Sequence, residues 1–253
     1  MCKVVIGAHE SDQSMIDTHL HILPGVDDGP DSLQESLMLA QELVRSGVHS
    51  AIATPHYNDM YPQRSAAEIR ERVWDLQQAL DRHAIPLRLF AGHEVLIKAG
   101  LLEDIQAGRV ATLNGSRYLL LELWSSSWLP ETEWVIFELL SAGIVPVIAH
   151  PERYRVIQQD QQRLIALLQQ GVLAQLMAGS LIGKQGKSAR STAEILLKKG
   201  LIHCIASDSH GLRKRPPVII ESLQYAAKLL DSARIYQLIE TWPGAILKNE
   251  DIV

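Results

Sequence analysis

The sequence predicts an α/β fold of parallel strands alternating with helices, and it favours a barrel. Short apolar runs alternate with longer segments of helical period along the chain, and glycines stand at many of the expected helix ends. Histidines and carboxylates follow one strand after another, as they do at the mouth of a barrel. An open doubly wound sheet would have a similar rhythm, so the polar residues decide between these folds.

Seven strands are expected, each an apolar run bounded by polar or turn-forming residues. They cover residues 15–23, 48–54, 87–94, 118–123, 144–149, 172–177 and 201–207. Ser32 and Glu35 form a capping box that opens the helix after the first strand, and Gly47 ends that helix. Ser65 and Glu68 repeat the box before the helix that precedes the third strand.

Helical periodicity and end signals predict the remaining helices. Three lie between later strands, at about 131–142, 160–170 and 188–199, and three follow the last strand, at 218–230, 232–241 and from Pro243 onward.

Length and charge limit the class of protein. With 253 residues and 47% hydrophobic side chains, we expect one domain over 15–253, preceded by a flexible extension, residues 1–14. A net charge of -5 gives no general attraction for nucleic acid or an anionic membrane. Cys2 and Cys204 lie far apart, and neither a signal peptide nor a long apolar run occurs. We therefore expect a cytoplasmic protein that is not inserted in a membrane.

The first strand carries a pair of histidines. His19 and His21 share one face of the strand, so both imidazoles can bind one transition metal. Asp27 and Asp28 follow in the loop GVDDGP, where Asp27 by itself is better explained as a turn former.

Later strands add further polar groups near their carboxyl ends. These residues are His56, Glu94, Glu122, His150, Asp208 and His210. Each alone has a structural explanation, as a core histidine or a helix cap. Because the carboxyl ends of parallel barrel strands share one mouth, we expect them to meet. His93 alternates with Glu94 and could face away, and the histidines assigned no role are His9, His49, His83 and His203.

The kinds of ligand indicate the kind of metal. Imidazole and carboxylate without thiolate suit manganese, iron, zinc or cobalt. About eight candidate ligands are too many for one ion, so we expect two or three metals that share a bridging carboxylate. Glu94 is the candidate bridge.

These residues lie in blocks that resemble the PHP superfamily of metal-dependent phosphoesterases. Within it, the sequence is most similar to bacterial protein-tyrosine phosphatases of capsule and exopolysaccharide synthesis, the CpsB/YwqE type. The matching blocks are MIDTHLHILPGVDDGPDSLQES, AIATPHY, GHE, LLLEL, VIAHPERY, QLMAGSLIGKQG and IASDSHGLRKRPP. The resemblance implies a distorted, TIM-like barrel of seven βα units, a three-metal centre usually described with manganese, although magnesium is an alternative, and hydrolysis of phosphotyrosine.

The resemblance also implies roles for individual residues. It implies metal ligation by His19, His21, Asp28, His56, Glu94, Glu122, His150, Asp208 and His210. Arg153 and Arg215 match arginines that hold the phosphate, a role that suits the guanidinium fork. The implied partner is a bacterial tyrosine kinase with a phosphotyrosine-rich tail.

We hypothesise that a hydroxide bridging two metals attacks phosphorus while the arginines hold the phosphoryl oxygens. Asp208 or His210 could donate a proton to the leaving group. No covalent phosphoenzyme is required. Neither Cys2 nor Cys204 begins a Cys-x5-Arg signature, which excludes a cysteine-nucleophile mechanism.

Some residues depart from the family pattern. Met177 stands where asparagine is common, and the segment WSSSWLP brings Trp124 and Trp128 near the expected site, where packing is a better explanation for them than stacking on substrate. The alternative functions are a phosphatase for a small phosphomonoester such as histidinol phosphate, a PHP phosphodiesterase, and a non-catalytic binding module. An amidohydrolase would commonly need a lysine at a later strand end, and none is found there.

Overall fold

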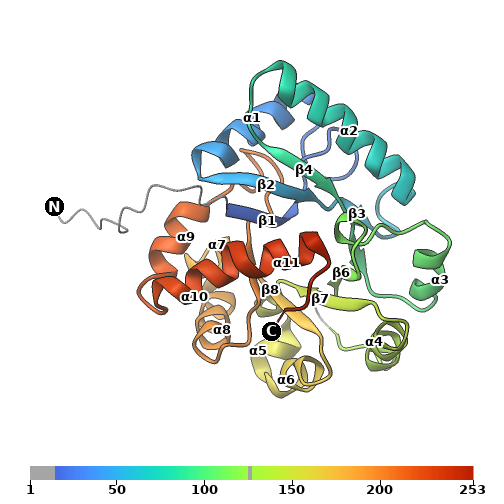
Figure 1. Ribbon diagram of the computed structural model, residues 1–253. Coiled ribbons are helices and arrows are strands. Elements are labelled where there is room, and N and C mark those ends of the chain that lie inside the picture. Colours follow the sequence, from blue (N-terminus) through green and yellow to red (C-terminus); the bar gives the residue numbers. More distant parts are fainter. Residues whose placement is uncertain (1–14, 125–126, 253) are drawn as a thin grey trace.

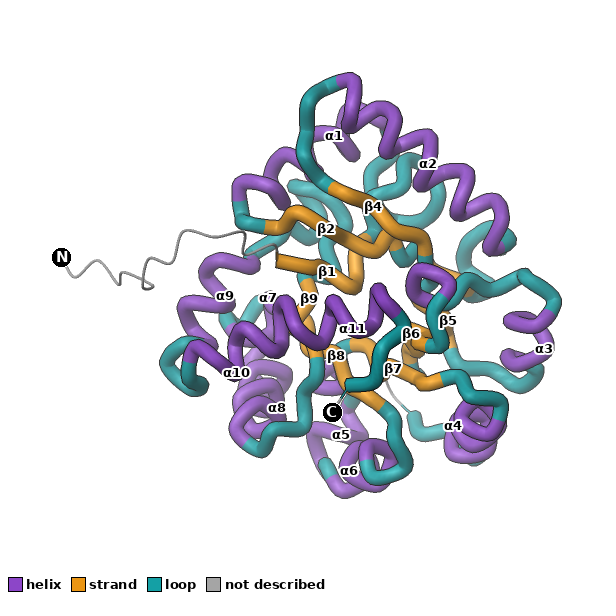
Figure 2. The backbone as a smooth tube through the Cα atoms, in the orientation of Figure 1, coloured by secondary structure: helices purple, strands orange, loops and turns teal. Residues whose placement is uncertain are grey.

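The strands are parallel in both sheets of the structure, a computed structural model that describes residues 15–124 and 127–252. One sheet has the order β1-β2-β4, and the other has the order β3-β5-β6-β7-β8-β9 (Figures 1 and 2). The strands are β1 (Met15–Leu20), β2 (Val48–Ala53), β3 (His56–Tyr57), β4 (Arg88–Ala91), β5 (Glu94–Leu96), β6 (Tyr118–Glu122), β7 (Val145–Ala149), β8 (Leu173–Met177) and β9 (Cys204–Ala206). The predicted α/β class is confirmed.

The strands expected over 48–54 and 87–94 end earlier than predicted. Pro55 separates β2 from β3, since proline cannot donate a ladder hydrogen bond. Gly92 lies between β4 and β5, where a Cβ atom would stand 3.0 and 3.1 Å from neighbouring side chains. Beyond these breaks the chain enters the second sheet, in which His56 of β3 pairs with Glu94 of β5.

The first strand lies beside the segment that follows the last strand. Leu20 and Ser209 form an isolated parallel bridge. The backbone N–H of His21 donates to the carbonyl of Ser209 at 3.0 Å, and the N–H of Asp208 donates to the carbonyl of His19 at 3.0 Å. Residues at the end of β1 therefore lie beside residues of the segment that follows β9.

Most helices surround the strands, whereas α11 crosses the middle of the view in Figure 1. The α-helices of the described residues are α1 (Leu33–Arg45), α2 (Ala66–Arg82), α3 (Leu101–Gln106), α4 (Thr132–Ser141), α5 (Arg155–Gln159), α6 (Gln162–Leu168), α7 (Ala178–Leu181), α8 (Gly186–Lys198), α9 (Ile219–Ala226), α10 (Ser232–Tyr236) and α11 (Trp242–Lys248). The capping box of Ser65 and Glu68 is confirmed. Ser32 caps α1, but the Glu35 carboxylate accepts from the N–H of Asp31.

Strand β6 shows how the sheet separates core from site. Leu119 and Leu121 on one face belong to the larger core, to which the helices contribute. Tyr118 and Leu120 on the other face belong to a smaller cluster with Ile246 of α11. Glu122 follows on that second face, so the face is apolar at the amino end and polar at the carboxyl end.

Candidate metal centre

Strand β1 and the residue that follows it present Asp17, His19 and His21 on one face, each at most 1% exposed. The Nε2 atoms of His19 and His21 are 3.1 Å apart. The predicted i, i+2 spacing thus brings both ring nitrogens to one point at the carboxyl end of the strand.

Asp27 orients one of these rings. Its Oδ2 atom lies 2.6 Å from Nδ1 of His21 and accepts from the backbone N–H of His56, and its Oδ1 atom accepts from the N–H of Gly29. Burial alone would raise the pKa of Asp27, but the charge and hydrogen bond of His21 lower it to about 2. The interpretation of Asp27 as a turn former was incomplete, because the carboxylate also leaves Nε2 of His21 facing the cluster.

Gln175 acts in the same way on the other ring. Its Oε1 atom lies 3.1 Å from Nδ1 of His19, and its amide nitrogen donates to the hydroxyl of Thr18 at 3.1 Å. With Nδ1 as the donor, Nε2 of His19 faces the cluster with its lone pair.

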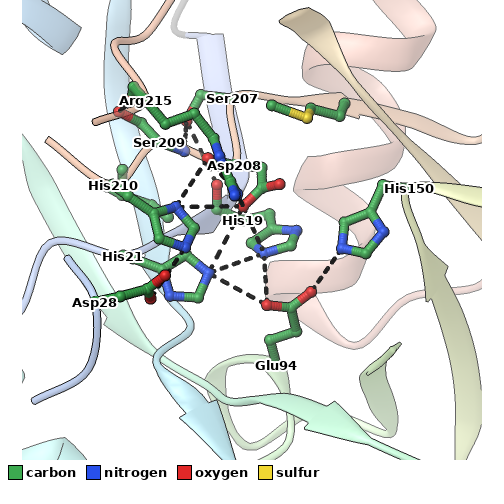
Figure 3. Close-up of polar contacts among 12 residues, drawn as sticks. His19, His21, Asp28, Glu94, His150, Ser207, Asp208, Ser209, His210 and Arg215 are labelled. Carbon is green, nitrogen blue, oxygen red and sulfur yellow. Dashed lines mark hydrogen bonds and ion pairs between the residues drawn. The ribbon is translucent and has the colours of Figure 1, made fainter. Parts of the chain in front are cut away.

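The carboxylate of Glu94 points toward His19, His21 and His150 (Figure 3). Its Oε2 atom is 3.2 Å from Nε2 of His19, 3.3 Å from Nε2 of His21 and 3.0 Å from Nδ1 of His56. Its Oε1 atom is 2.9 Å from Nε2 of His150. Burial would raise the pKa of Glu94, but the charges of His19 and His56 and the hydrogen bonds from His150 and His19 hold it well below its usual range.

The ligand atoms form three overlapping groups, and within each group they lie within 4.8 Å of one another. The groups are His21, Asp28, His56 and His210; His19, His21 and Glu94; and His56, Glu94 and Glu122. Several buried atoms of this cluster make no hydrogen bond although they approach each other closely. They are Asp28 Oδ1, His56 Nδ1 and His210 Nε2. Unpaired donors and acceptors that converge in this way fit metal ions.

The segment after β9 adds an aspartate between the imidazoles and two arginines. Oδ1 of Asp208 is 3.4 Å from Nε2 of His19 and 2.6 Å from Nη1 of Arg215. Its Oδ2 atom is 3.2 Å from Nη1 of Arg153. His210 Nε2 lies 3.3 Å from Oδ1 of Asp28. All the site residues predicted on this segment therefore meet at the cluster.

Glu122 and His150 occupy the edge of the cluster. Oε1 of Glu122 is 4.0 Å from Nε2 of His150, and its side chain is 22% exposed, whereas that of Glu94 is 1% exposed. Burial and the negative charge of Glu94 raise the pKa of Glu122 to about 7. Burial and the charge of Arg153 lower the pKa of His150 to about 4. Glu122 is thus more accessible to solvent than Glu94, although less so than Asp28, whose side chain is 40% exposed.

Other predicted residues lie apart from the cluster. His93 accepts a hydrogen bond from the backbone N–H of Ala111 and faces away from the cluster. Met177 is buried, and Trp128 packs on the core and donates to Glu133 at 2.7 Å. Trp124 is 45% exposed, so the expectation that it packs in the core was wrong. His9 and the extension 1–14 lie outside the described residues.

Sequence reasoning gave no site role to Asp17, Asp27 and Gln175. Signals for two of them were present: Asp17 precedes His19 by two strand positions, and Gln175 is a polar residue inside the apolar run of β8. The contact of Asp27 with His21 depends on how the intervening loop folds back, which periodicity does not report.

A parallel α/β fold with imidazoles and carboxylates gathered at its strand ends defines a protein with a candidate multinuclear metal centre. The sequence model of the family described as "Capsular polysaccharide synthesis, CpsB/CapC" matches residues 15–248. The chain belongs to this family, which confirms the resemblance seen in its motifs.

Two relatives and one solved structure show how far the likeness extends. The chain is 34% identical over 238 residues to tyrosine-protein phosphatase YwqE of Bacillus subtilis (strain 168), with 94% of this chain and 93% of the relative covered. It is 30% identical over 241 residues to tyrosine-protein phosphatase CpsB of Streptococcus pneumoniae, with 93% and 99% covered. The structural match, at a TM-score of 0.91 and 33% identity, covers 94% of this chain and 96% of the other. The matched structure is one of the crystal structures of YwqE from Bacillus subtilis and CpsB from Streptococcus pneumoniae, which are described as unique metal-dependent tyrosine phosphatases.

Among the described helices, none has both the length and the apolar character needed to cross a membrane.

Proposed function

We propose that this chain is a metal-dependent protein-tyrosine phosphatase. Its substrate would be phosphotyrosine on a bacterial tyrosine kinase of capsular or exopolysaccharide synthesis. The observation that carries the proposal is the meeting of Arg153 and Arg215 on Asp208, at the edge of a cluster fit to bind metals. The names of the relatives support the choice of substrate.

Nine residues would hold the metal ions, with Glu94 shared between positions. They are His19, His21, Asp28, His56, Glu94, Glu122, His150, Asp208 and His210. Three overlapping groups support a centre of up to three ions. Manganese is our first choice, and iron, zinc, cobalt and magnesium are the alternatives. Bound metals supply an acidified water and neutralise charge on phosphoryl oxygens.

Arg153 and Arg215 would bind the phosphoryl group. Their side chains are 29% and 27% exposed, whereas the Asp208 carboxylate that they contact is 2% exposed. They therefore present cationic N–H groups on the solvent side of the cluster. A phosphate dianion accepts from such groups in the same way as the carboxylate does, and the planar fork fixes its orientation.

We keep Asp208 and His210 as candidates for the proton that the leaving phenolate takes up. A phenolate, whose conjugate phenol has a pKa of about 10, needs less help from a proton donor than an alkoxide does. Cys204, the cysteine within the described residues, does not support a cysteine nucleophile, because it is fully buried and burial raises its pKa to about 12.

We also propose that the fold is a distorted barrel of seven βα units forming one domain over 15–253. Support comes from the hydrogen bonds that join β1 to the segment after β9, and from β3 and β5, which prolong β2 and β4. The proposed location is the cytoplasm, where the kinase tail would lie.

A substrate panel tests the proposed function. Metal-free protein is prepared with a chelator, reloaded with manganese, and assayed on a phosphotyrosine peptide, a phosphoserine peptide, histidinol phosphate and an aryl phosphodiester. We expect manganese to restore activity, with the highest kcat/KM on the phosphotyrosine peptide. Full activity without metal, or a strong preference for histidinol phosphate or the diester, would overturn the proposal.

A further inference from the structure

Asp17 is a buried carboxylate beside the metal cluster that is not among the proposed ligands. Its side chain accepts three hydrogen bonds. Oδ2 accepts from the hydroxyl of Ser207 at 2.5 Å, and Oδ1 accepts from the backbone N–H groups of Ser207 at 3.0 Å and His19 at 3.3 Å. The carboxylate therefore ties β1 to the segment after β9, across 190 residues of sequence.

The hydrogen bonds continue from Ser207 to Arg215 (Figure 3). The Ser207 hydroxyl accepts from the N–H of Ser209 at 3.1 Å. The Ser209 hydroxyl donates to the carbonyl of Arg215 at 2.7 Å, and the same carbonyl accepts from the N–H of His210 at 3.0 Å. Asp17 thus anchors a chain of contacts that ends on the backbone of a proposed phosphate-binding residue.

This chain of contacts encloses a strained residue. Asp208 lies between the two serines with a φ of 50°, in the left-handed region that costs a side-chain-bearing residue about 1 kcal/mol or more. Such a conformation persists only where its surroundings fix it. The bonds to Ser207 and Ser209 on either side provide that restraint.

We propose that Asp17 is a positioning residue that holds Asp208 and Arg215 in place relative to His19 and His21. A carboxylate is required because all three groups that face it are donors. Asparagine would turn an N–H group toward one of them and leave that donor unpaired. This inference rests on the proposed function for the roles of Asp208 and Arg215.

Variants of Ser207 and a matched control test the inference. Ser207→Ala removes the hydroxyl that links Asp17 to Ser209, and Ser207→Thr keeps a hydroxyl there. Ser222→Ala removes an equally buried hydroxyl on α9, which donates to the carbonyl of Val218 at 2.6 Å. Asp17→Asn is measured alongside. For each protein, Mn²⁺ affinity is measured by titration calorimetry and stability by thermal unfolding. The values of kcat and KM are measured on a phosphotyrosine peptide.

We expect Ser207→Ala and Asp17→Asn to lower Mn²⁺ affinity and kcat about tenfold or more, the range seen when groups that orient metal ligands are removed. Ser207→Thr should restore most of the loss, and Ser222→Ala should lower only the unfolding midpoint. The inference is overturned if Ser207→Ala binds Mn²⁺ and turns over like wild type, or if Ser222→Ala shows the same losses. If Asp17→Asn does not fold, the Ser207 pair decides.

The metal readout separates this inference from the proposed function. Wild type that is inactive on phosphotyrosine, with Mn²⁺ affinity still reduced in Ser207→Ala, would refute the substrate and leave the positioning role supported.

Discussion

The Nδ1 atom of His21 lies 2.6 Å from Oδ2 of Asp27, and neither side chain is more than 1% exposed. The carboxylate accepts from that nitrogen and from the backbone N–H of His56. A single aspartate thus fixes the ring of one proposed ligand and the backbone of another. The two proposed ligands, His21 and His56, belong to the group that also contains Asp28 and His210.

Replacing Asp27 with asparagine should weaken metal binding. The asparagine amide carries no negative charge beside His21, so the imidazole ring loses part of its orientation and some of its basicity. We expect Mn²⁺ affinity to fall about 10- to 100-fold, measured by titration calorimetry on metal-free protein. Asp31→Asn, an exposed change in the same loop, is the control and should bind like wild type. Equal affinity in the two variants would contradict the orienting role.

Arg215→Ala should impair substrate binding and leave the metals in place. The guanidinium contacts Asp208 at 2.6 Å but is not itself a metal ligand. We expect KM for a phosphotyrosine peptide to rise about tenfold or more, because a charged hydrogen bond to phosphate contributes roughly 1.5–3 kcal/mol. Arg213→Ala, an exposed neighbour, is the matched control. Loss of manganese from Arg215→Ala, detected by elemental analysis, would point to a structural role instead.

Metal removal should lower the thermal unfolding midpoint. Ligands that bind only the folded state stabilise it by about 2.7 kcal/mol at a concentration of 100 Kd. For a chain of this length, that corresponds to a rise of about 5 to 10 °C on adding Mn²⁺ to metal-free protein. His19→Ala, which removes a proposed ligand, should respond much less. An unfolding midpoint that excess Mn²⁺ leaves unchanged in wild type would contradict a resident metal centre.

His203 should make stability depend on pH. Burial and the charge of Arg234 lower its pKa to about 4 in the folded protein, below the ordinary value of 6.5. The unfolded chain therefore takes up this proton first, and stability is lost as the pH falls from about 6.5 to about 4. His203→Asn keeps an acceptor for the N–H of Ala174 but does not titrate.

The variant should lose about 1 to 3 kcal/mol less stability than wild type between pH 7 and pH 4, measured by denaturant unfolding in the presence of a chelator. Comparing the two proteins cancels the titration of the clustered histidines, which both retain. Parallel stability curves over this range would show that His203 does not contribute.

Much of this arrangement could be predicted because its signals are local. The alternation of β1 placed His19 and His21 on one face, and Ser65 with Glu68 marked the start of α2. Short elements such as α3 were not predicted, because six residues are too few for a helical period to stand out. The contacts of Asp27 and Gln175 depend on neighbours distant in sequence or on the path of a loop.

The breaks after β2 and β4 show the same limit. Pro55 is visible as a breaker in the sequence, but the break at Gly92 lies where side chains from other elements crowd the place that a Cβ atom would take. The sequence therefore predicts a single strand over 87–94. The structure instead starts a new strand at Glu94, which places that carboxylate among the histidines.

The pairing of β1 with the segment after β9 bears on how the protein is made. His19 and His21 leave the ribosome well before Asp208 and His210, which follow almost 190 residues later. A contact that spans 190 residues cannot form until both partners have been translated. A nascent chain can therefore expose its early histidines to metal, but it acquires the complete ligand set only after the last strand has been released.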